Sequence, residues 1–294
     1  MKLKLFLLLE KVLMSLPKGA RKAFFSFLAS TAYHLSAKSR KIVRQNLEFA
    51  FDGKMSENEI DEITRYSFKN LLFNFMHLME LRYMSKEELA KKVTIQNKEA
   101  VDRVHAQNRA VIYVTTHYSS WELGGASLGA LVEPLAAVYK RMQDPTFEGW
   151  LLESRARFGN TNLEKTKVIK PLIKLIRQKK ACGILIDTNI HQKEGLIVDF
   201  MGKTIRQTYT PSYLARKFNA AIIPVTIRTD DEENYTLMLF DEIPVEKTDD
   251  EEADLQKATQ LQADWLTNLI TNEPKFWFWL HRRWKNDHPE IYQK

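Results

Sequence analysis

Cysteine is almost absent from this sequence. Cys182 is the single cysteine among 294 residues, so the chain can form neither an internal disulfide nor a cysteine-based zinc site, which suits a reducing compartment. The seven histidines show no close metal-ligand spacing, and no segment resembles a zinc finger, a basic zipper or another nucleic-acid-binding module. We therefore expect no metal and no nucleic-acid partner.

Long hydrophobic runs are also missing. The apolar run over residues 5–9 stops at Glu10 and Lys11, whereas a membrane-spanning helix needs about 20 apolar residues. No small-residue cleavage site follows this run, so we do not expect a secretory signal. The sequence has no internal repeat and no low-complexity linker, and its length is enough for one large or two small domains.

The composition is that of a folded protein with a basic surface. Hydrophobic residues make up 44% of the chain and charged residues 28%, which allows a sizeable core. There are 44 Lys and Arg against 37 Asp and Glu, so the formal net charge is +7. A basic balance of this size points to an acidic partner, such as phosphate groups, an anionic membrane surface or an acidic protein.

The first 35 residues contain two helical stretches, over residues 1–16 and 20–35, separated by a Pro-Lys-Gly break. Both combine basic residues with leucine or aromatic faces, the pattern of an amphipathic helix at a membrane surface. The alternative is that they are core helices of a soluble domain. We expect residues 1–35 to be a membrane-associated helical segment that rests on the membrane, and residues 36–294 to form the main domain.

After residue 110 the expected elements change from mostly helices to strands that alternate with helices. A helix is expected over residues 56–84, then a short helix from Ser85 and a short strand over residues 93–96. Further strands are expected over residues 110–116, 135–140, 181–186, 197–200, 221–227 and 235–240, with helices over 120–131, 146–158, 170–179, 210–218 and 251–271. This alternation indicates an α/β fold.

The stretch AVIYVTTHYSSWELGG, over residues 110–125, places His117 on a turn between a strand and a helix. If Glu122 in the first helical turn folds back onto the imidazole, the carboxylate orients the ring while the other nitrogen takes a proton from an alcohol. The alternative is that Ser119 and Glu122 form a capping box and that His117 is a hydrogen-bonded histidine at a strand end. The spacing alone leaves both interpretations open.

Other charged residues lie where predicted strands end. Lys140 and Arg141 end a strand and Arg155 lies on the following helix, so these side chains can form an anion site, or simply a solvated basic surface. Asp187 ends an apolar run and either serves a site or caps the next turn.

Residues 275–285 read KFWFWLHRRWK, the densest mixture of aromatic and basic residues in the chain. Arg282 and Arg283 can pair with anionic headgroups or substrate phosphates, and tryptophan suits an interface with one apolar and one wet side. The alternative is a C-terminal segment that packs its tryptophans into the core.

These motifs resemble a known family. HYSSWE is similar to the His-x-x-x-x-Asp/Glu block of glycerolipid-type acyltransferases. The ordered blocks VYKRMQDP, ILIDTN, VDFMGK and FWFWLHRRWK, with RQNL at residues 44–47, resemble the lipid A biosynthesis acyltransferases over nearly the whole chain. The resemblance implies a mixed central sheet with helices on both faces, preceded by the N-terminal helical region.

The resemblance also implies an activity. A fatty acyl group would pass from acyl carrier protein to a hydroxyl of an acyl chain on a Kdo-lipid A precursor, at the cytoplasmic face of the bacterial inner membrane. Acyl carrier protein would be a co-substrate, and no cofactor would be needed. His117 would be the general base and Glu122 its partner, although in some members the carboxylate is the key group, so their division of labour stays open.

The resemblance assigns the remaining residues less completely. Arg141 falls in the family's Tyr-Arg-Pro segment, where Lys140 and Met142 replace its neighbours, and Arg155 is an alternative basic residue near the substrate. Asp187 falls in the family's Asp-Gln position, where Thr188 replaces the glutamine.

Elementary chemistry supports such a reaction, and two other functions fit the same sequence. The acceptor hydroxyl needs a base, and backbone N–H groups at the helix start after Ser120 can stabilise the negative charge on the thioester carbonyl. One alternative is an acyl-CoA-dependent enzyme that acts on another glycolipid, such as a phosphoinositol mannoside. The other is a non-enzymatic membrane-binding protein that uses its basic aromatic C-terminal segment as a lipid patch.

Overall fold

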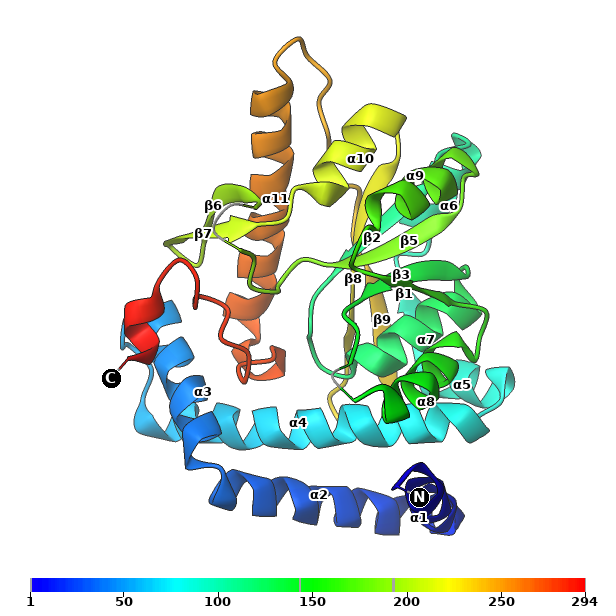
Figure 1. The fold of residues 1–294 in the computed structure, drawn as a ribbon, viewed down its shortest axis with the longest axis vertical. Coiled ribbons are helices and arrows are strands. Elements are labelled where there is room, and N and C mark those ends of the chain that lie inside the picture. The colour runs from blue at the N-terminus through cyan, green and yellow to red at the C-terminus, as the bar shows by residue number, and fades with distance from the viewer. Residues whose placement is uncertain (1, 143, 192–193, 294) are drawn as a thin grey trace.

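A computed structural model describes residues 2–142, 144–191 and 194–293. Its centre is a seven-stranded sheet with the order β1-β9-β8-β2-β5-β3-β4 (Figure 1). The strands are β1 Val93–Gln96, β2 Val111–Thr115, β3 Leu135–Tyr139, β4 Thr161–Glu164, β5 Ala181–Leu185, β8 Ala221–Arg228 and β9 Tyr235–Leu239. Only the β8–β9 pair is antiparallel, so the sheet is mixed, as expected. A separate antiparallel hairpin joins β6 Leu196–Phe200 to β7 Lys203–Gln207.

Two different helical layers cover the two faces of the sheet. Side chains of successive residues in β2 point to opposite faces of the sheet. Val111 and Tyr113 belong to one core cluster, and Ile112 and Val114 belong to the other. The first cluster contains side chains of α5 Lys86–Lys92, α6 Glu99–Ala106 and α7 Trp121–Leu131. The second contains side chains of α9 Ile169–Arg177, α10 Thr210–Phe218 and α11 Glu251–Asn272. The predicted α/β fold with helices on both faces is confirmed.

The N-terminal helices lie along one side of this body (Figure 1). They are α1 Lys2–Ser15, α2 Lys18–Leu35, α3 Ala37–Ala50 and the 27-residue α4 Glu57–Tyr83. A capping box between Ser56 and Glu59 begins α4. The helices α1 and α8 Pro145–Ala156 share a third core cluster with α2 and α4. None of the helices in the described residues has the length and hydrophobicity needed to cross a bilayer.

Four of these helices and strands were not expected from the sequence: α3, α6, β4 and β7. The edge strand β4 reads TNLE and β7 reads KTIRQ, so both carry polar residues where a buried strand would be apolar. The helix α6 has only eight residues, too few for a clear helical period. The remaining elements lie where they were expected, with ends that differ by a few residues.

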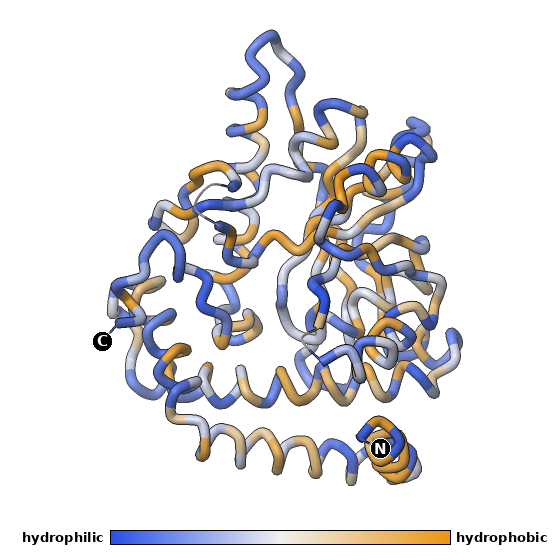
Figure 2. The backbone as a smooth tube through the Cα atoms, in the orientation of Figure 1, coloured by the Kyte–Doolittle hydropathy of each residue, from blue (hydrophilic) through white to orange (hydrophobic). Residues whose placement is uncertain are grey.

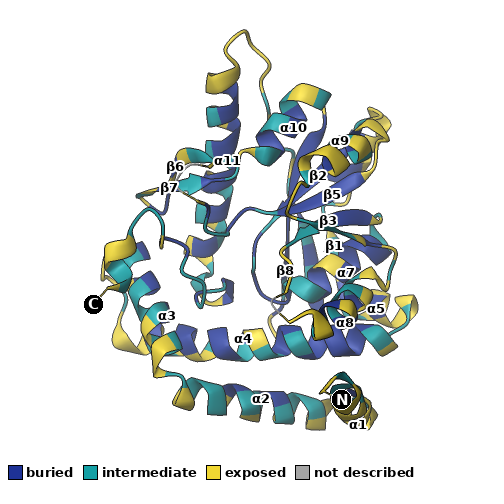
Figure 3. Cartoon of the chain, in the orientation of Figure 1, coloured by how far each residue is buried: buried dark blue, intermediate teal, exposed yellow. Residues whose placement is uncertain are grey.

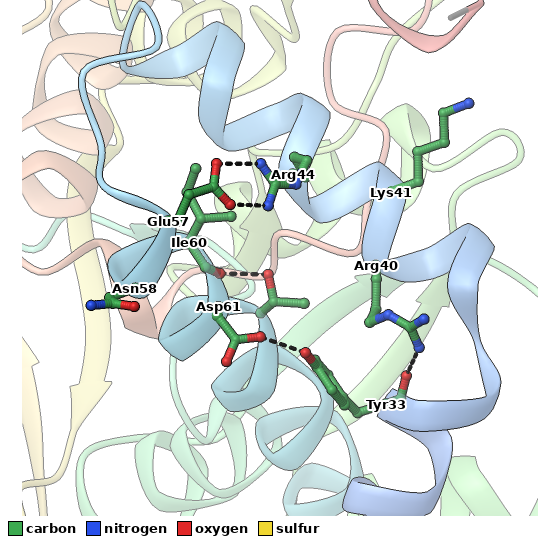
Figure 4. Close-up of a pocket in the computed structure, with 9 residues that line it drawn as sticks. Tyr33, Arg40, Lys41, Arg44, Glu57, Asn58, Ile60 and Asp61 are labelled. Carbon is green, nitrogen blue, oxygen red and sulfur yellow. Dashed lines mark hydrogen bonds and ion pairs between the residues drawn. The ribbon is translucent and has the colours of Figure 1, made fainter.

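A cavity of about 530 Å³ lies between α3 and the start of α4 (Figure 4). Both carboxylates that line it already have partners, because Arg44 donates to Glu57 at 2.8 Å and the Tyr33 hydroxyl donates to Asp61. Arg40 donates to the backbone carbonyl of Tyr33. We therefore regard this cavity as a feature of helix packing, and it shares no lining residue with the cavity at the strand ends.

Candidate active site

His117 lies just beyond the carboxyl end of β2, and Asp187 lies just beyond the carboxyl end of β5. These neighbouring parallel strands are in a register that pairs Thr115 with Leu185, and the N–H of Ile186 donates to the carbonyl of Thr115. The next residues of both strands therefore meet at the same edge of the sheet. This is where ligands usually bind in open α/β sheets.

The Asp187 carboxylate receives hydrogen bonds from four donors. Oδ1 lies 3.0 Å from Nδ1 of His117, while Oδ2 accepts from the Thr116 hydroxyl at 2.7 Å, the His117 N–H at 2.8 Å and the Trp277 indole N–H at 3.1 Å. Burial alone would raise the pKa of Asp187, but the charge of His117 and these hydrogen bonds hold it well below its usual range. Asp187 is therefore ionised, and it fixes the orientation of the imidazole.

The electrostatics of His117 suit a general base that becomes charged during the reaction. Burial alone would lower its pKa, but the charge and hydrogen bond of Asp187 outweigh burial, and the charge of Glu122 adds to them, so the pKa is raised. The side chain is 27% exposed and lines a cavity. Because Asp187 occupies Nδ1, Nε2 is the nitrogen that can accept a proton from a substrate.

The expected pairing of Glu122 with His117 was wrong, because the carboxylate that binds the imidazole is Asp187. Glu122 instead pairs with Arg155 through two hydrogen bonds, from Nε to Oε2 at 2.9 Å and from Nη2 to Oε1 at 2.6 Å. The reason is geometric: α8 packs beside α7 and brings Arg155 over the first turn of α7. The capping box between Ser119 and Glu122 is also not observed, because the N-cap of α7 is Ser120, which makes no side-chain hydrogen bond, and the Glu122 carboxylate binds Arg155.

Asn74, on the long helix α4, holds the turn between His117 and Glu122. Its Oδ1 accepts from the N–H of Glu122 at 3.1 Å and its Nδ2 donates to the carbonyl of Ser119 at 2.9 Å. Ser119 has a φ of 49°, in the left-handed region, so the turn needs such support. Asn74 was not identified from the sequence. It also occupies the N–H of Glu122, which is therefore not available to a substrate oxyanion.

The C-terminal aromatic segment forms one wall of the site. Residues 276–278 run antiparallel to residues 117–119, with the N–H of Ser119 donating to the carbonyl of Phe276 at 2.8 Å and that of Phe278 to His117 at 3.0 Å. The ring of His117 lies 5.3 Å from that of Trp121 and 5.9 Å from that of Phe278. The tryptophans at 277, 279 and 284 are at most 1% exposed, so the core alternative is correct for them.

The prediction that Arg283, in the same segment, pairs with headgroups or substrate phosphates was wrong. Its side chain is completely buried and donates to the backbone carbonyls of Thr188 at 3.1 Å and Arg206 at 3.2 Å. Burial lowers the pKa of Arg283 to about 10. A headgroup cannot reach it, so Arg283 supports the fold. Arg282 stacks on the ring of Tyr292 at 5.4 Å and is not among the described residues that line the cavity, so its predicted contact with substrate stays a prediction.

Asn46 of the early RQNL motif fixes this segment from the other side. Its buried amide donates to the carbonyls of Trp279 at 2.7 Å and His281 at 2.8 Å, and its oxygen accepts from the Tyr292 hydroxyl at 2.6 Å. The motifs at the two ends of the sequence therefore meet in the structure.

The cavity beside His117 has a volume of about 1580 Å³, which is more than most small-molecule sites need. It is lined by five of the predicted site residues, His117, Glu122, Lys140, Arg141 and Arg155. Apolar and glycine residues of α7 and of the central strands line another part of it, among them Gly125, Leu128, Leu135, Gly183 and Val225. The site can therefore hold a long apolar chain next to a base and a charged rim.

The predicted anion site is brought together at this cavity, but its cations are partly engaged. Arg155 is bound to Glu122, and Arg141 lies 3.3 Å from Glu148 with its side chain 67% exposed. Lys165 and Lys167 also line the cavity and are exposed, although the sequence analysis did not identify them. Binding of an anion here is not demonstrated and stays a prediction.

Comparisons with known proteins agree with this geometry. A family model described as bacterial lipid A biosynthesis acyltransferase matches residues 3–286. A lipid A biosynthesis lauroyltransferase of Escherichia coli (strain K12) is 25% identical over 264 residues, which cover 88% of this chain and 83% of the relative. A palmitoleoyltransferase of the same strain is 24% identical over 259 residues, 84% and 79% of the two chains, and a myristoyltransferase is 22% identical over 209 residues, 71% and 64%. The three names specify three acyl groups.

Proposed function

Because this chain belongs to the bacterial lipid A biosynthesis acyltransferase family, we propose that it moves a fatty acyl group from acyl carrier protein to a hydroxyl of an acyl chain on a Kdo-lipid A precursor. Membership in the family makes the chain an acyltransferase of lipid A biosynthesis. The donor, the acceptor and a location at the cytoplasmic face of the inner membrane are our proposal. The observation that carries it is an oriented imidazole, His117 on Asp187, in a cavity large enough for acyl chains.

In the proposed reaction, Nε2 of His117 removes the proton of the acceptor hydroxyl as its oxygen attacks the thioester carbonyl. Asp187 stabilises the imidazolium that forms, since its carboxylate stays ionised. The tetrahedral intermediate then collapses, the carbon–sulfur bond breaks, and the leaving thiolate takes the proton from the imidazolium. An ester has formed, a thioester has been broken, and His117 is neutral again.

The Glu122–Arg155 pair has a different proposed role. Both residues line the cavity beside His117, and the carboxylate holds the guanidinium in place through two hydrogen bonds. A fixed guanidinium in a water-poor site can stabilise the negative charge that develops on the carbonyl oxygen. Glu122 is then a positioning residue, and the loss of either partner should lower the rate.

The basic rim of the cavity supports an acidic donor. Lys140, Arg141, Lys165 and Lys167 line the cavity and are exposed, and acyl carrier protein is acidic. The phosphates of the lipid acceptor can use the same cations. Acyl-CoA is also anionic, so a direct assay with both donors tests the choice.

The test has two parts. Lipid A from cells with and without the protein is compared by mass spectrometry, and the purified protein is assayed with acyl-ACP and acyl-CoA on the Kdo-lipid A precursor. We expect one additional acyl chain that depends on the protein, and faster transfer from acyl-ACP. His117→Ala should lower transfer by about 10²-fold or more, the usual range for losing a general base. Unchanged lipid A, or faster transfer from acyl-CoA, would contradict the proposal.

A further inference from the structure

The segment that follows α11 places a second imidazole at the large cavity. Residues 276–284 are all buried or half-buried (Figure 3), although strongly hydrophilic residues are among them (Figure 2). One of these is His281, whose half-buried side chain lines the same cavity as His117. The proposed reaction does not use it. What His281 can do there depends on which ring nitrogen is free and on whether the ring is charged.

Backbone hydrogen bonds fix the position of His281 relative to His117. The N–H of Phe278 donates to the carbonyl of His117 at 3.0 Å, and the N–H of His281 donates to the carbonyl of Phe278 at 3.3 Å. On the other side, the side-chain amide of Asn46 donates to the carbonyl of His281 at 2.8 Å. The two rings therefore belong to one hydrogen-bonded part of the backbone, which keeps them in place before a substrate binds.

The backbone at Asn189 sets the tautomer of His281. Its N–H donates to Nε2 of the ring at 3.1 Å, so Nε2 carries the lone pair and the proton of the neutral ring is on Nδ1. Nδ1 is neither enclosed by the protein nor hydrogen-bonded to a described residue. Because the ring lines the cavity, its Nδ1–H is a donor that a ligand there can use.

The surroundings of His281 keep its ring neutral. Burial lowers the pKa of His281 to about 4, and the positive charges of His117, Arg283 and Lys140 act in the same direction, while the charge of Asp187 opposes them. A neutral imidazole donates a hydrogen bond without tending to release its proton. An enzyme that needs an N–H donor near neutral pH can therefore use an imidazole whose pKa is lowered in this way.

One loop orients both histidines and gives them opposite chemical characters. After β5, the Asp187 carboxylate binds Nδ1 of His117 and leaves Nε2 as a proton acceptor. Two residues later, the N–H of Asn189 binds Nε2 of His281 and leaves Nδ1 as a donor. The pKa of His117 is raised despite burial, and that of His281 is lowered by burial. Groups whose surroundings separate their pKa values in this way divide the tasks of a reaction between them.

Acyl transfer needs hydrogen-bond donors, because negative charge develops on the carbonyl oxygen of the thioester. The turn before α7 does not supply them at two of its backbone positions, since the N–H groups of Ser119 and Glu122 donate to other residues of the protein. Arg155 is a charged donor whose Nε and Nη2 already bind Glu122. The Nδ1–H of His281 is a neutral donor that has no partner among the described residues.

We propose that His281 is a second catalytic residue, whose Nδ1–H donates a hydrogen bond to the carbonyl oxygen of the thioester. This hydrogen bond strengthens as the hydroxyl attacks and the carbonyl oxygen becomes an oxyanion, and it weakens again when the carbon–sulfur bond breaks. His281 keeps its proton throughout, so every proton transfer still passes through His117. The inference rests on the proposed acyl transfer and adds a neutral donor to it.

The experiment measures kcat and KM of full-length variants with acyl-ACP and the Kdo-lipid A precursor. His281→Phe keeps a flat ring and removes both nitrogens. His281→Asn has its amide nitrogen as many bonds from Cα as Nδ1, so a donor remains for the cavity. His281→Gln has its amide oxygen as many bonds from Cα as Nε2, so it can accept from Asn189 without that donor. The matched control is His105→Phe, because His105 is exposed on α6 and is not among the described residues that line the cavity.

His281→Phe and His281→Gln should lower kcat by about 10²-fold or more, the usual cost of losing one donor to an oxyanion. His281→Asn should lower it by about tenfold or less, because a donor remains. KM should not change, since the hydrogen bond is stronger in the transition state than in the ground state. The acid limb of the pH profile should stay in place, because the lost group is neutral and His117 is the base. His105→Phe should have the kcat of the wild type.

A purely structural role of His281 predicts a different order of rates. If the ring only holds the loop at Asn189, His281→Gln keeps the kcat of the wild type, while His281→Phe and His281→Asn lower the melting temperature. That result, a wild-type kcat in His281→Phe or a displaced acid limb overturns the inference. Circular dichroism checks folding, and if His281→Phe does not fold, the comparison of His281→Asn with His281→Gln decides. If the wild type itself transfers no acyl group, the proposed function fails, and the inference fails with it.

Discussion

Replacing Asp187 by asparagine removes the charge beside His117 and keeps the size of the side chain. Four donors converge on the carboxylate at distances of 2.7 to 3.1 Å, and an amide offers one acceptor oxygen while its NH₂ group faces donors. Asp187→Asn should therefore misorient the imidazole and leave the imidazolium without its counter-charge. We expect kcat to fall by about 10²- to 10⁴-fold, which is about 2.7 to 5.4 kcal/mol of transition-state stabilisation.

The pH profile of the variant gives a second, independent signature. In the wild type the charge and hydrogen bond of Asp187 outweigh burial, which alone would lower the pKa of His117, so that pKa is raised. A general base works only when it is neutral, so activity is lost as the pH falls through this pKa. Without Asp187, burial dominates and the pKa falls. The acid limb of the kcat/KM profile should therefore move to lower pH in Asp187→Asn.

The assay compares kcat/KM across pH for the wild type, Asp187→Asn, Glu122→Gln and Asp249→Asn. Asp249 is exposed and does not line the cavity, so its variant controls for the loss of one negative charge. Glu122→Gln should lower the rate with a smaller shift of the acid limb, because Glu122 contributes less than Asp187 to the pKa of His117. A wild-type rate and profile in Asp187→Asn, or a larger shift in Glu122→Gln, would refute the reasoning.

Three other variants test the supporting residues. Asn74→Ala leaves the partly buried N–H of Glu122 and the buried carbonyl of Ser119 without partners, so the free energy of unfolding in urea should fall by about 1–3 kcal/mol, and kcat should fall with it. Asn58→Ala, exposed on the same helix, should change neither quantity. Arg283→Ala should lower the melting temperature, because the side chain is buried, and should leave the KM for the lipid acceptor unchanged in the folded fraction. A raised KM with normal stability would show instead that Arg283 binds the headgroup of the acceptor. Arg155→Lys keeps the charge but cannot bind Glu122 through two parallel hydrogen bonds. The rate of acyl transfer in single-turnover measurements should therefore fall by about tenfold or more. A normal rate would exclude the proposed role of Arg155 in stabilising the oxyanion.

Sequence patterns located His117 and the edge of the sheet but assigned the wrong carboxylate to it. The position of His117 follows from a local signal, an apolar strand that ends in a polar turn before a helix. Its partner Asp187 lies 70 residues later, and only the register of β2 against β5 brings the two together. The sequence did place both residues at strand ends, so knowledge of the strand order would have sufficed to pair them. Glu122 was favoured because it is near in sequence, which says little about distance across a tight turn.

Other parts of the site had no local signal at all. Asn74 is one of several polar residues on α4, and nothing in a helical pattern distinguishes the one that will meet a turn 45 residues later. Trp277 and Arg283 lie in a segment whose aromatic and basic composition suits a lipid interface as well as a core. Burial decided between these interpretations, and burial depends on long-range packing that the α/β pattern does not specify. The hydrophobicity of α1 was evident, but the inward direction of Glu10 was not.

The wall that residues 276–278 build beside His117 has a consequence for synthesis. A nascent chain that has emerged only as far as α11 already carries the histidine, both carboxylates and the guanidinium of the site. It still lacks the indole that donates to Asp187 and the backbone that pairs with residues 117–119. The protein can therefore gain a competent centre only after residues 276–278 leave the ribosome, and a product terminated before them would retain the catalytic side chains without the means to align them.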